Sequence, residues 1–309
     1  MSFKNFKDKI EENDTVMLYL SPQSIHVIKV MPKIVTRKGN EVENIFQTVY
    51  GALKVMDLVG MSYGAKVNLT KGYGYILQPT PELWTVTLPH RTQVLYTPDI
   101  SMVLLQLDIR PGCIVVESGT GSGSLSHALI RAIAPDGKLH TYEFHEQRAK
   151  IASEEFKEHG FEDLVVVHNQ NVCEAGFGLE NVADSVFLDL PSPWLAINHA
   201  LTSLKSNGRI CSFSPCMEQV QKTCIELEKL RFLEITIIEC LEREFQVKNI
   251  SVADSELFSF DNDSVNNSLK SFRGFTTPLK MPGHTGYLTF ATAPMKSSLS
   301  QEIEVVNGS

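Results

Sequence analysis

Short, closely spaced β-forming segments fill the first part of the chain. Segments such as TVMLYLS at 15–21 and GYGYILQP at 72–79 are rich in β-branched and aromatic residues, and Gly, Pro, Asn or Lys separates them. Spacing of this kind predicts a small all-β barrel or sandwich. We expect no amphipathic helix before about residue 80, and an irregular connection over 80–96.

The hydrophobic pattern changes at Thr97, after which apolar runs alternate with helical periodicity. The run Ile114–Val116 has no polar alternation and therefore predicts a buried parallel strand. The expected strands are 114–116, 138–142, 164–168, 183–188, 209–214, 234–239 and 286–292. The expected helices are 98–107, 122–134, 146–159 and 218–230. Alternation of this kind predicts an α/β fold with a doubly wound parallel sheet.

These patterns divide the chain into three parts. Residues 1–90 are expected to form a β-barrel-like domain, and 91–294 the α/β domain. Within the second part, 251–275 is mostly polar and lacks apolar periodicity, so we expect a flexible insertion there. Residues 295–309 are expected to form a disordered tail.

A glycine-rich turn follows the first strand of the predicted α/β domain. In ESGTGSGS (117–124), Gly119, Gly121 and Gly123 fall on alternate positions before a helical pattern begins. Glycine allows a ligand to approach the backbone, and the N-terminus of a helix favours a carboxylate. A dinucleotide fingerprint would need glycine at Ser124, which argues against a nicotinamide oxidoreductase. A plain tight turn is the alternative.

The spacing E-x-G-x-G-x-G, which begins at Glu117, resembles motif I of the S-adenosylmethionine-dependent methyltransferases. Ligands of open α/β sheets bind where strands end, and polar positions follow the later strands. Glu143 comes 24 positions after Gly119, as expected of an acid that accepts ribose hydroxyls. Asn171 and Val172 follow the third strand and could read an adenine edge. The alternatives are a helix-terminal acid and an ordinary loop asparagine.

Asp189 is the strongest candidate for chemistry outside the glycine turn. It follows the apolar strand residues 186–188 and precedes LPSPW, whose two prolines stiffen the loop. The order D-x-P-x-P-W resembles motif IV of methyltransferases that modify nitrogen on a base. An aspartate that caps the next helix is the alternative.

Charge and composition indicate which part of the chain would contact a polyanion and in which compartment the protein would act. The net charge is −8, yet residues 1–100 carry 11 basic and 9 acidic residues. Contact with a polyanion is therefore expected at the N-terminal part or through a more basic partner, although a solvated lysine face is the alternative. The six cysteines form no C-x-x-C pair, so we expect reduced thiols and no structural metal. Because no apolar run is long enough to span a membrane, we expect an intracellular protein.

Segments along most of the chain resemble the catalytic subunits of eukaryotic tRNA (adenine-58-N1)-methyltransferases. They are 80–96 (TPELWTVTLPHRTQVLY), 117–149, 187–194 (FLDLPSPW), 212–221 and 283–292. The resemblance implies a Rossmann-like class I methyltransferase domain that transfers a methyl group from S-adenosylmethionine to N1 of adenine 58 in the tRNA T-loop. It also implies a non-catalytic paralogous partner, a heterotetramer of two catalytic and two non-catalytic chains, and residence in the nucleus.

The resemblance also assigns roles to single residues. The positions matching cofactor contacts are Leu95, Ser122, Gly123, Ser124, Glu143, Arg148 and Asp189. The positions matching the tRNA-binding loop are His90, Arg91, Thr92, Gln93 and Tyr96. Asp189 also matches the residue that meets the target base, so it is the expected catalytic residue, and Tyr96 is a candidate wall for that base. Asn171 stands where relatives often have Asp.

Two further functions stay open at this point. A methyltransferase of another RNA, of a small molecule or of a protein would share the cofactor domain, and one that acts on a small molecule or a protein would not need the β domain or its lysines. An inactive RNA-binding paralogue would predict a degraded glycine turn and loss of Asp189, and both are intact here.

Overall fold

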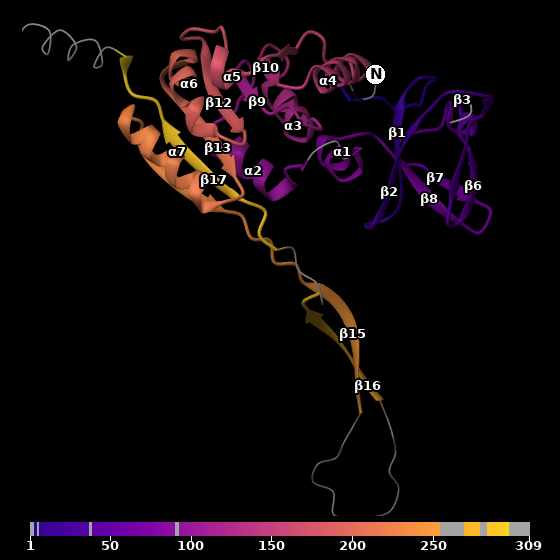
Figure 1. The fold of residues 1–309 in the computed structure, drawn as a ribbon. Helices are drawn as coiled ribbons and strands as arrows, with labels where there is room; N and C mark the ends of the chain where they lie inside the picture. The colour runs from indigo at the N-terminus through magenta and orange to yellow at the C-terminus, as the bar shows by residue number, and fades with distance from the viewer. Residues whose placement is uncertain are drawn as a thin grey trace, which may run out of the picture. The chain divides into compact units, whose positions relative to one another are not determined.

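The computed structural model describes residues 3–4, 6–36, 39–89, 93–253, 269–278 and 283–296 (Figure 1). The chain forms two compact units, one of Met1–Ile238 and Gly286–Ser309 and the other of Glu239–Thr285. The first unit holds both the N-terminal β structure and the central sheet, so the expected boundary at residue 90 falls inside it. No helix of the described residues is long and apolar enough to cross a membrane.

The N-terminal part forms a small β structure around its own core. Its antiparallel sheet has the order β2-β1-β8-β7. The strands of this sheet are β1 (Thr15–Ser21), β2 (Ser24–Lys29), β7 (Lys66–Leu69) and β8 (Gly72–Leu77). The two hairpins beside it are β3 (Lys33–Val35) with β4 (Glu41–Glu43), and β5 (Ile45–Thr48) with β6 (Gly51–Lys54), which leads into η1 (Val55–Leu58). Val16, Leu18 and Ile76 are fully buried in this core, and the strands around it confirm the expected all-β domain.

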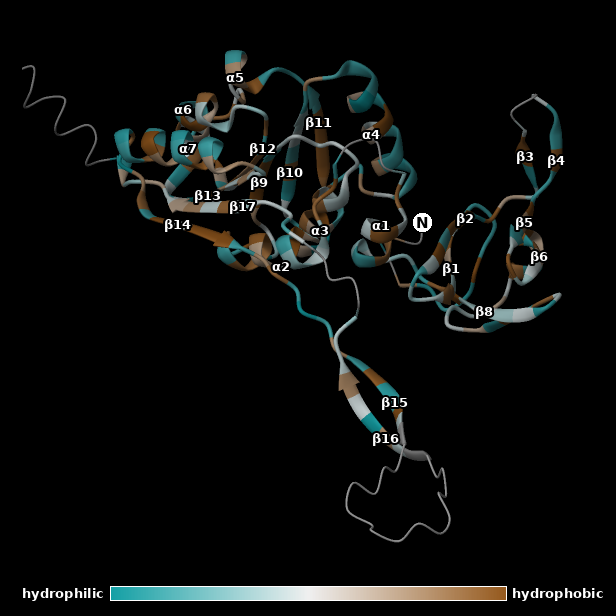
Figure 2. Cartoon of the chain, turned by 60° about the horizontal axis from the view of Figure 1, so that its bottom comes forward, coloured by the Kyte–Doolittle hydropathy of each residue, from teal (hydrophilic) through white to brown (hydrophobic). Residues whose placement is uncertain are grey.

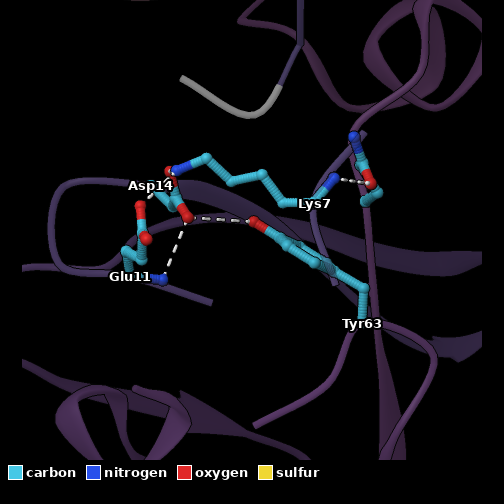
Figure 3. Close-up of polar contacts among 5 residues, drawn as sticks. Lys7, Glu11, Asp14 and Tyr63 are labelled. Carbon is cyan, nitrogen blue, oxygen red and sulfur yellow. Dashed lines mark hydrogen bonds and ion pairs between the residues drawn. The ribbon is translucent and has the colours of Figure 1, made fainter. Parts of the chain in front are cut away.

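A buried carboxylate attaches the segment before β1 to this structure (Figure 3). Asp14, which is 2% exposed, accepts hydrogen bonds from the N–H of Glu11 at 3.0 Å and the hydroxyl of Tyr63 at 3.3 Å. The ammonium of Lys7 lies 2.9 Å from the same carboxylate. Burial alone would raise the pKa of Asp14, but the hydrogen bonds and the Lys7 charge lower it below its ordinary value. The N-terminal segment is therefore held by a partnered buried charge.

A short helix stands where we expected an irregular connection. α1 (Pro81–Thr87) begins after Thr80, whose hydroxyl oxygen accepts a hydrogen bond from the helix backbone, and proline occupies its first position. Both features are ordinary helix-start signals, so the expectation was wrong over this stretch. Trp84 packs with Met17 of β1, which places the helix on the outer face of the N-terminal sheet.

A seven-stranded sheet forms the centre of the rest of the first unit, in the order β11-β10-β9-β12-β13-β17-β14. Its strands are β9 (Ile114–Ser118), β10 (Lys138–Glu143), β11 (Val165–Asn169), β12 (Ala183–Asp189), β13 (Leu204–Ser214), β14 (Leu233–Glu239) and β17 (Tyr287–Thr292). The pairs from β11 to β13 are parallel, whereas β17 runs antiparallel to β13. The expectation of a purely parallel sheet was wrong at this edge, because β17 follows the hairpin of the second unit instead of a crossover helix.

Helices cover both faces of this sheet. The expected ones are α2 (Thr97–Gln106), α3 (Ser124–Ile133), α4 (Glu146–Glu158) and α7 (Met217–Lys229). The unexpected ones are α5 (Val172–Ala175), η2 (Pro193–Leu195) and α6 (Ile197–Ser203). Ser126 of α3 binds Glu117, whereas α6 and α7 share a core with Val116. Because neighbouring strand residues point to opposite faces, α3 lies on one face and α6 and α7 on the other.

The second unit contains a two-stranded hairpin of β15 (Gln246–Ala253) and β16 (Leu269–Thr276). We expected a flexible insertion over 251–275, and that expectation was wrong at both of its ends. The sequence pattern did not predict these strands, because the apolar residues that pair across the hairpin lie in two distant segments. Val247 and Phe275 are one such pair. The stretches 254–268 and 297–309 lie outside the described residues.

Candidate active site

The glycine turn is in direct contact with the end of β12. Gly119, Gly121 and Gly123 have φ angles of 97°, 53° and 77°, which glycine adopts without strain. A Cβ added at Gly119 would overlap the carbonyl oxygen of Asp189 and lie 3.1 Å from its carbonyl carbon. A side chain at this position would therefore push the turn away from the Asp189 backbone.

The strand order brings these two segments together. From β9 the chain continues to β10 and β11 on one side of the sheet, and then to β12 and β13 on the other side. The strand order therefore reverses beside β9. Ligands of open α/β sheets bind outside the carboxyl ends of the strands at such a point. A cleft of about 550 Å³ lies there, and its walls include Gly119, Gly121, Glu143 and Asp189. The structure thus unites four residues that the sequence had singled out.

Glu143 is buried in the wall of this cleft, with 4% exposure. One of its carboxylate oxygens accepts from the N–H of Gly121 at 3.2 Å, and the other from the N–H of His145 at 3.0 Å. The guanidinium of Arg148 lies 3.0 Å from the second oxygen. Three donors therefore fix the orientation of a carboxylate whose remaining lone pairs can accept hydroxyl groups.

Asp189 ends β12 in a partly buried position on the same wall. Burial, together with the negative charge of Glu143, raises the pKa of Asp189 to about 6. A carboxyl group with a perturbed pKa in a cleft is typical of a functional site. Two acidic side chains facing one cleft also favour a positively charged ligand.

Glu117 lies beneath the glycine turn, in a narrow crevice that shares Gly119 and Asp189 with this cleft. It is 1% exposed, and its carboxylate accepts hydrogen bonds from the hydroxyls of Ser126 at 2.6 Å and Thr141 at 2.7 Å. Burial raises the pKa of Glu117 to about 7, although these hydrogen bonds act in the opposite direction. The structure therefore places Glu117 as a support for the turn, and Glu117 does not itself line the larger cleft.

Leu95, Ser122 and Ser124 lie with Glu117 at a narrow crevice that adjoins the cleft at Gly121. The hydroxyl of Ser124 donates to the carbonyl of Leu95 at 3.0 Å and lies 2.9 Å from the hydroxyl of Thr85 in α1. These contacts tie the start of α3 to the segment before α2. The three candidates thus lie beside the turn and next to the cleft.

Asn171 and Val172 lie in the cleft wall, as does Arg148. The side-chain oxygen of Asn171 accepts from the N–H of Cys173 at 3.2 Å and so caps α5. Its amide NH₂ group is a donor and takes no part in that bond. Contact with an adenine edge stays a prediction for this residue.

Comparison with known proteins decides the family. A family model described as "tRNA methyltransferase complex GCD14 subunit" matches residues 72–277. The chain belongs to this family. The tRNA (adenine(58)-N(1))-methyltransferase catalytic subunit TRM61 of Candida albicans is 43% identical over 265 residues, which cover 82% of this chain and 76% of that protein. The corresponding trmt61a subunit of Dictyostelium discoideum is 37% identical over 312 residues, which cover 91% and 96%.

Solved structures agree with this GCD14-family assignment at the level of the fold. A SAM-dependent O-methyltransferase from Thermotoga maritima matches with a TM-score of 0.75 and 26% identity, over 95% of this chain and 97% of that one. The tRNA (m1A58) methyltransferase TrmI from Aquifex aeolicus matches with a TM-score of 0.69 and 22% identity, over 92% and 98%. The expected class I methyltransferase fold is confirmed.

The tRNA-binding loop expected for this GCD14-family chain is only partly placed. Gln93 lies in the cleft wall. Tyr96 is 42% exposed, and it is absent from the cleft wall that the described residues form. His90, Arg91 and Thr92 lie outside the described residues, so their contact with a substrate stays a prediction.

Sequence reasoning missed several residues of the cleft in this GCD14-family chain. Phe144 and His145 directly follow Glu143, and both lie in the cleft wall. Phe144 is 64% exposed, which is unusual for a large aromatic side chain at the end of a buried strand. An aromatic residue next to a strand-end acid is a signal that could have found it, because a ring beside a ribose acceptor can stack on a base. Cys173 in α5 gave no comparable signal.

Proposed function

We propose that this chain transfers a methyl group from S-adenosylmethionine to N1 of adenine 58 in tRNA. The observation that carries the proposal is the contact of Gly119 with the backbone of Asp189, which puts a cofactor-type turn and a strand-end acid on one cleft. Relatives that are 43% and 37% identical carry the name of the catalytic subunit for this reaction, which supports the choice of substrate.

The residues of the cleft fit S-adenosylmethionine, which supplies a methyl group already activated on a sulfonium. The N-terminus of α3 suits a carboxylate, because the first turn of a helix presents backbone N–H groups, and the glycines before it allow close approach to the backbone. The fixed carboxylate of Glu143 suits two ribose hydroxyls. The exposed ring of Phe144 and the amide of Asn171 suit the face and the edge of an adenine.

Asp189 is the residue that we expect to act on the target base. Adenine N1 is already nucleophilic, so alignment is the main task, and about 7–11 kcal/mol is available from alignment in favourable cases. Positive charge develops on the adenine ring during transfer, and a carboxylate at the N6 edge opposes that development electrostatically. The same carboxylate can orient the base, which must leave its stack because pairing hides N1.

We also propose that the chain works with a paralogous, non-catalytic subunit in a heterotetramer. The hairpin of the second unit supports this, since Phe272 and Phe275 are 56% and 76% exposed. The edge strand β14 is largely hydrophobic (Figure 2), and its Leu233 and Ile237 are 54% and 46% exposed. Exposed apolar surface of this extent marks an interaction site. A more basic partner would also offset the net charge of −8 during RNA binding.

Nucleoside mass analysis of an unmodified tRNA transcript tests the proposed reaction. The transcript is treated with S-adenosylmethionine and either the chain alone or the chain co-expressed with its paralogous subunit. We expect 1-methyladenosine at position 58, with a higher yield from the co-expressed preparation. The matched controls are a transcript with uridine at position 58 and the variant Asp189→Asn, which keeps the shape of the side chain but removes its charge.

Each other outcome points to a different function. A methylated nucleoside at another position, or methylation of a small molecule alone, would replace the proposed substrate while keeping the cofactor. Absence of a methylated product from both preparations would support an inactive RNA-binding paralogue.

A further inference from the structure

Successive side chains of β8 point alternately to the inner and to the outer face of the N-terminal sheet. Gly74 points inward, since a Cβ there would meet the side chains of Leu18 and Leu20 at 2.9 Å. Because strand residues alternate between faces, Tyr73 and Tyr75 point outward. They are 51% and 39% exposed, which is unusual for two neighbouring aromatic side chains on one sheet face.

The helix α1 covers only one half of this outer face. Met17 of β1 is buried against Trp84, and Leu77 of β8 packs against the same cluster. The uncovered half continues onto both strands that pair with β8. Tyr75 lies opposite Tyr19 of β1 on one side and opposite Lys66 of β7 on the other. We call this uncovered half the tyrosine face. Its residues are Tyr19, Lys66, Asn68, Tyr73 and Tyr75.

Side chains on the tyrosine face are arranged around the Tyr73 ring. The ammonium of Lys66 lies 3.8 Å from the centroid of that ring. The rings of Tyr73 and Tyr75 meet edge to face, with centroids 5.9 Å apart and an interplanar angle of 87°. The Tyr73 and Tyr75 hydroxyls make no hydrogen bond within the described part of the chain. Two aromatic surfaces and one cation are thus presented together.

The charge around the tyrosine face is positive in a chain that is acidic overall. The four strands of this sheet contain no acidic residue. Lys71, in the turn between β7 and β8, is exposed. Neither Lys66 nor Lys71 has an acidic partner among the residues that the structure describes. This face therefore complements a polyanion, in contrast to the net charge of −8.

We propose that the tyrosine face is a docking surface for unpaired nucleotides of the RNA substrate. The Lys66 ammonium moves from the Tyr73 ring to a phosphate, and bases stack on Tyr73 and Tyr75. The proposal rests on the proposed function, because it assumes an RNA substrate. Aromatic rings on a sheet, flanked by lysine, are a general means of holding unpaired bases. The lysine favours RNA over a protein partner, since lysine is depleted from protein interfaces.

The fold connects this face to the cleft. Val94 belongs to the same buried cluster as Met17 and Trp84, and Gln93 next to it lies in the cleft wall. Gln93 and Val94 thus join the cluster beneath α1 to the cleft wall. The tyrosine face would hold nucleotides away from the target adenine and so contribute to affinity without taking part in methyl transfer.

Binding of an unmodified tRNA transcript, measured by fluorescence anisotropy with the chain co-expressed with its paralogous subunit, tests the proposal. For the double variant Tyr73→Ala with Tyr75→Ala we expect roughly tenfold weaker binding or more, because stacking contributes substantially for each base. The double variant Tyr73→Phe with Tyr75→Phe keeps both rings and should bind within about twofold of wild type. Cofactor affinity, measured by calorimetry, should be unchanged in both.

The lysine has its own matched control. Lys66→Gln should reduce the slope of binding against salt concentration by about 1, as expected for loss of one phosphate contact. Lys33→Gln removes the same charge from the same domain, but Lys33 is ion-paired with Glu41 at 3.2 Å. The variant Lys33→Gln should therefore leave the slope of binding against salt concentration unchanged. Equal effects of both variants would show general electrostatic attraction and overturn the proposed contact.

Other outcomes would also overturn the proposal. Wild-type affinity of the alanine variant would show that no base stacks on these rings. Loss of the co-expressed subunit from the alanine variant would make the face a protein interface. Failure of the proposed function is distinguishable, because the wild-type protein would then give no 1-methyladenosine in tRNA, whatever the tyrosine variants do.

Discussion

Replacement of Gly119 by alanine tests the contact on which the proposed site depends. The residue has a φ of 97°, and an added Cβ would overlap the carbonyl oxygen of Asp189. Both the turn and the strand end are backbone here, so neither can move aside by a simple rotamer change. We expect the turn and Asp189 to separate.

Two contributions set the size of the effect. A positive φ at an L-residue costs about 1–2 kcal/mol. Overlap with packed neighbours costs typically about 1–3 kcal/mol more. The free energy of unfolding of Gly119→Ala should therefore fall by roughly 2–5 kcal/mol. Since the backbone N–H groups of the turn also move, the dissociation constant for S-adenosylmethionine should rise at least tenfold, or about 1.4 kcal/mol.

Gly112→Ala is a matched control for this change. Gly112 has a φ of 87°, but an added Cβ would meet no atom within 4 Å. The control therefore carries the conformational strain without the overlap, and we expect a loss of about 1–2 kcal/mol with unchanged cofactor affinity. Urea unfolding and titration calorimetry measure the two quantities for both variants. Equal stability losses with wild-type cofactor affinity in Gly119→Ala would refute the close contact and the shared cleft.

Further predictions concern the acids of the cleft and the hairpin. Asp189→Ala should lower the single-turnover rate at least 100-fold while calorimetry still detects cofactor binding; more than a tenth of the wild-type rate would contradict its role. With the pKa of Asp189 at about 6 and the ionised form active, kcat/KM should fall about tenfold per unit below pH 6, and a flat profile would exclude this ionisation. Glu143→Gln should weaken cofactor binding roughly tenfold in calorimetry, since it removes the charge that three donors face; unchanged binding would refute the ribose role. Replacing Phe272 and Phe275 by serine should abolish co-purification of the paralogous subunit, and retained co-purification would place the interface elsewhere.

The sequence determined the elements that depend on local patterns. The uninterrupted apolar run at Ile114 predicted β9, and the alternate glycines predicted the turn that follows it. Helical spacing predicted α3 and α4 within a few residues of their ends. The position of Asp189 at a strand end was also readable, because an apolar run stops there and prolines follow. Each of these signals lies within a dozen residues.

Other local signals were present but were not read correctly. Thr80 followed by proline starts α1, yet the helix is too short for its periodicity to stand out. The strands β15 and β16 alternate apolar and polar residues only in part, and each needs its partner to be recognised. These misses follow from short elements whose stability comes from contacts elsewhere.

Only the tertiary structure decided which strand ends meet. Gly119 and Asp189 are 70 positions apart, and nothing near either residue states that β12 lies beside β9. Packing also decided that Glu117 faces α3 from below the turn while Glu143 faces the cleft. Local side-chain patterns determine helices and strands because they follow the period of each element. Strand order and the burial of single charges depend on contacts between distant segments, which leave no periodic trace in the sequence.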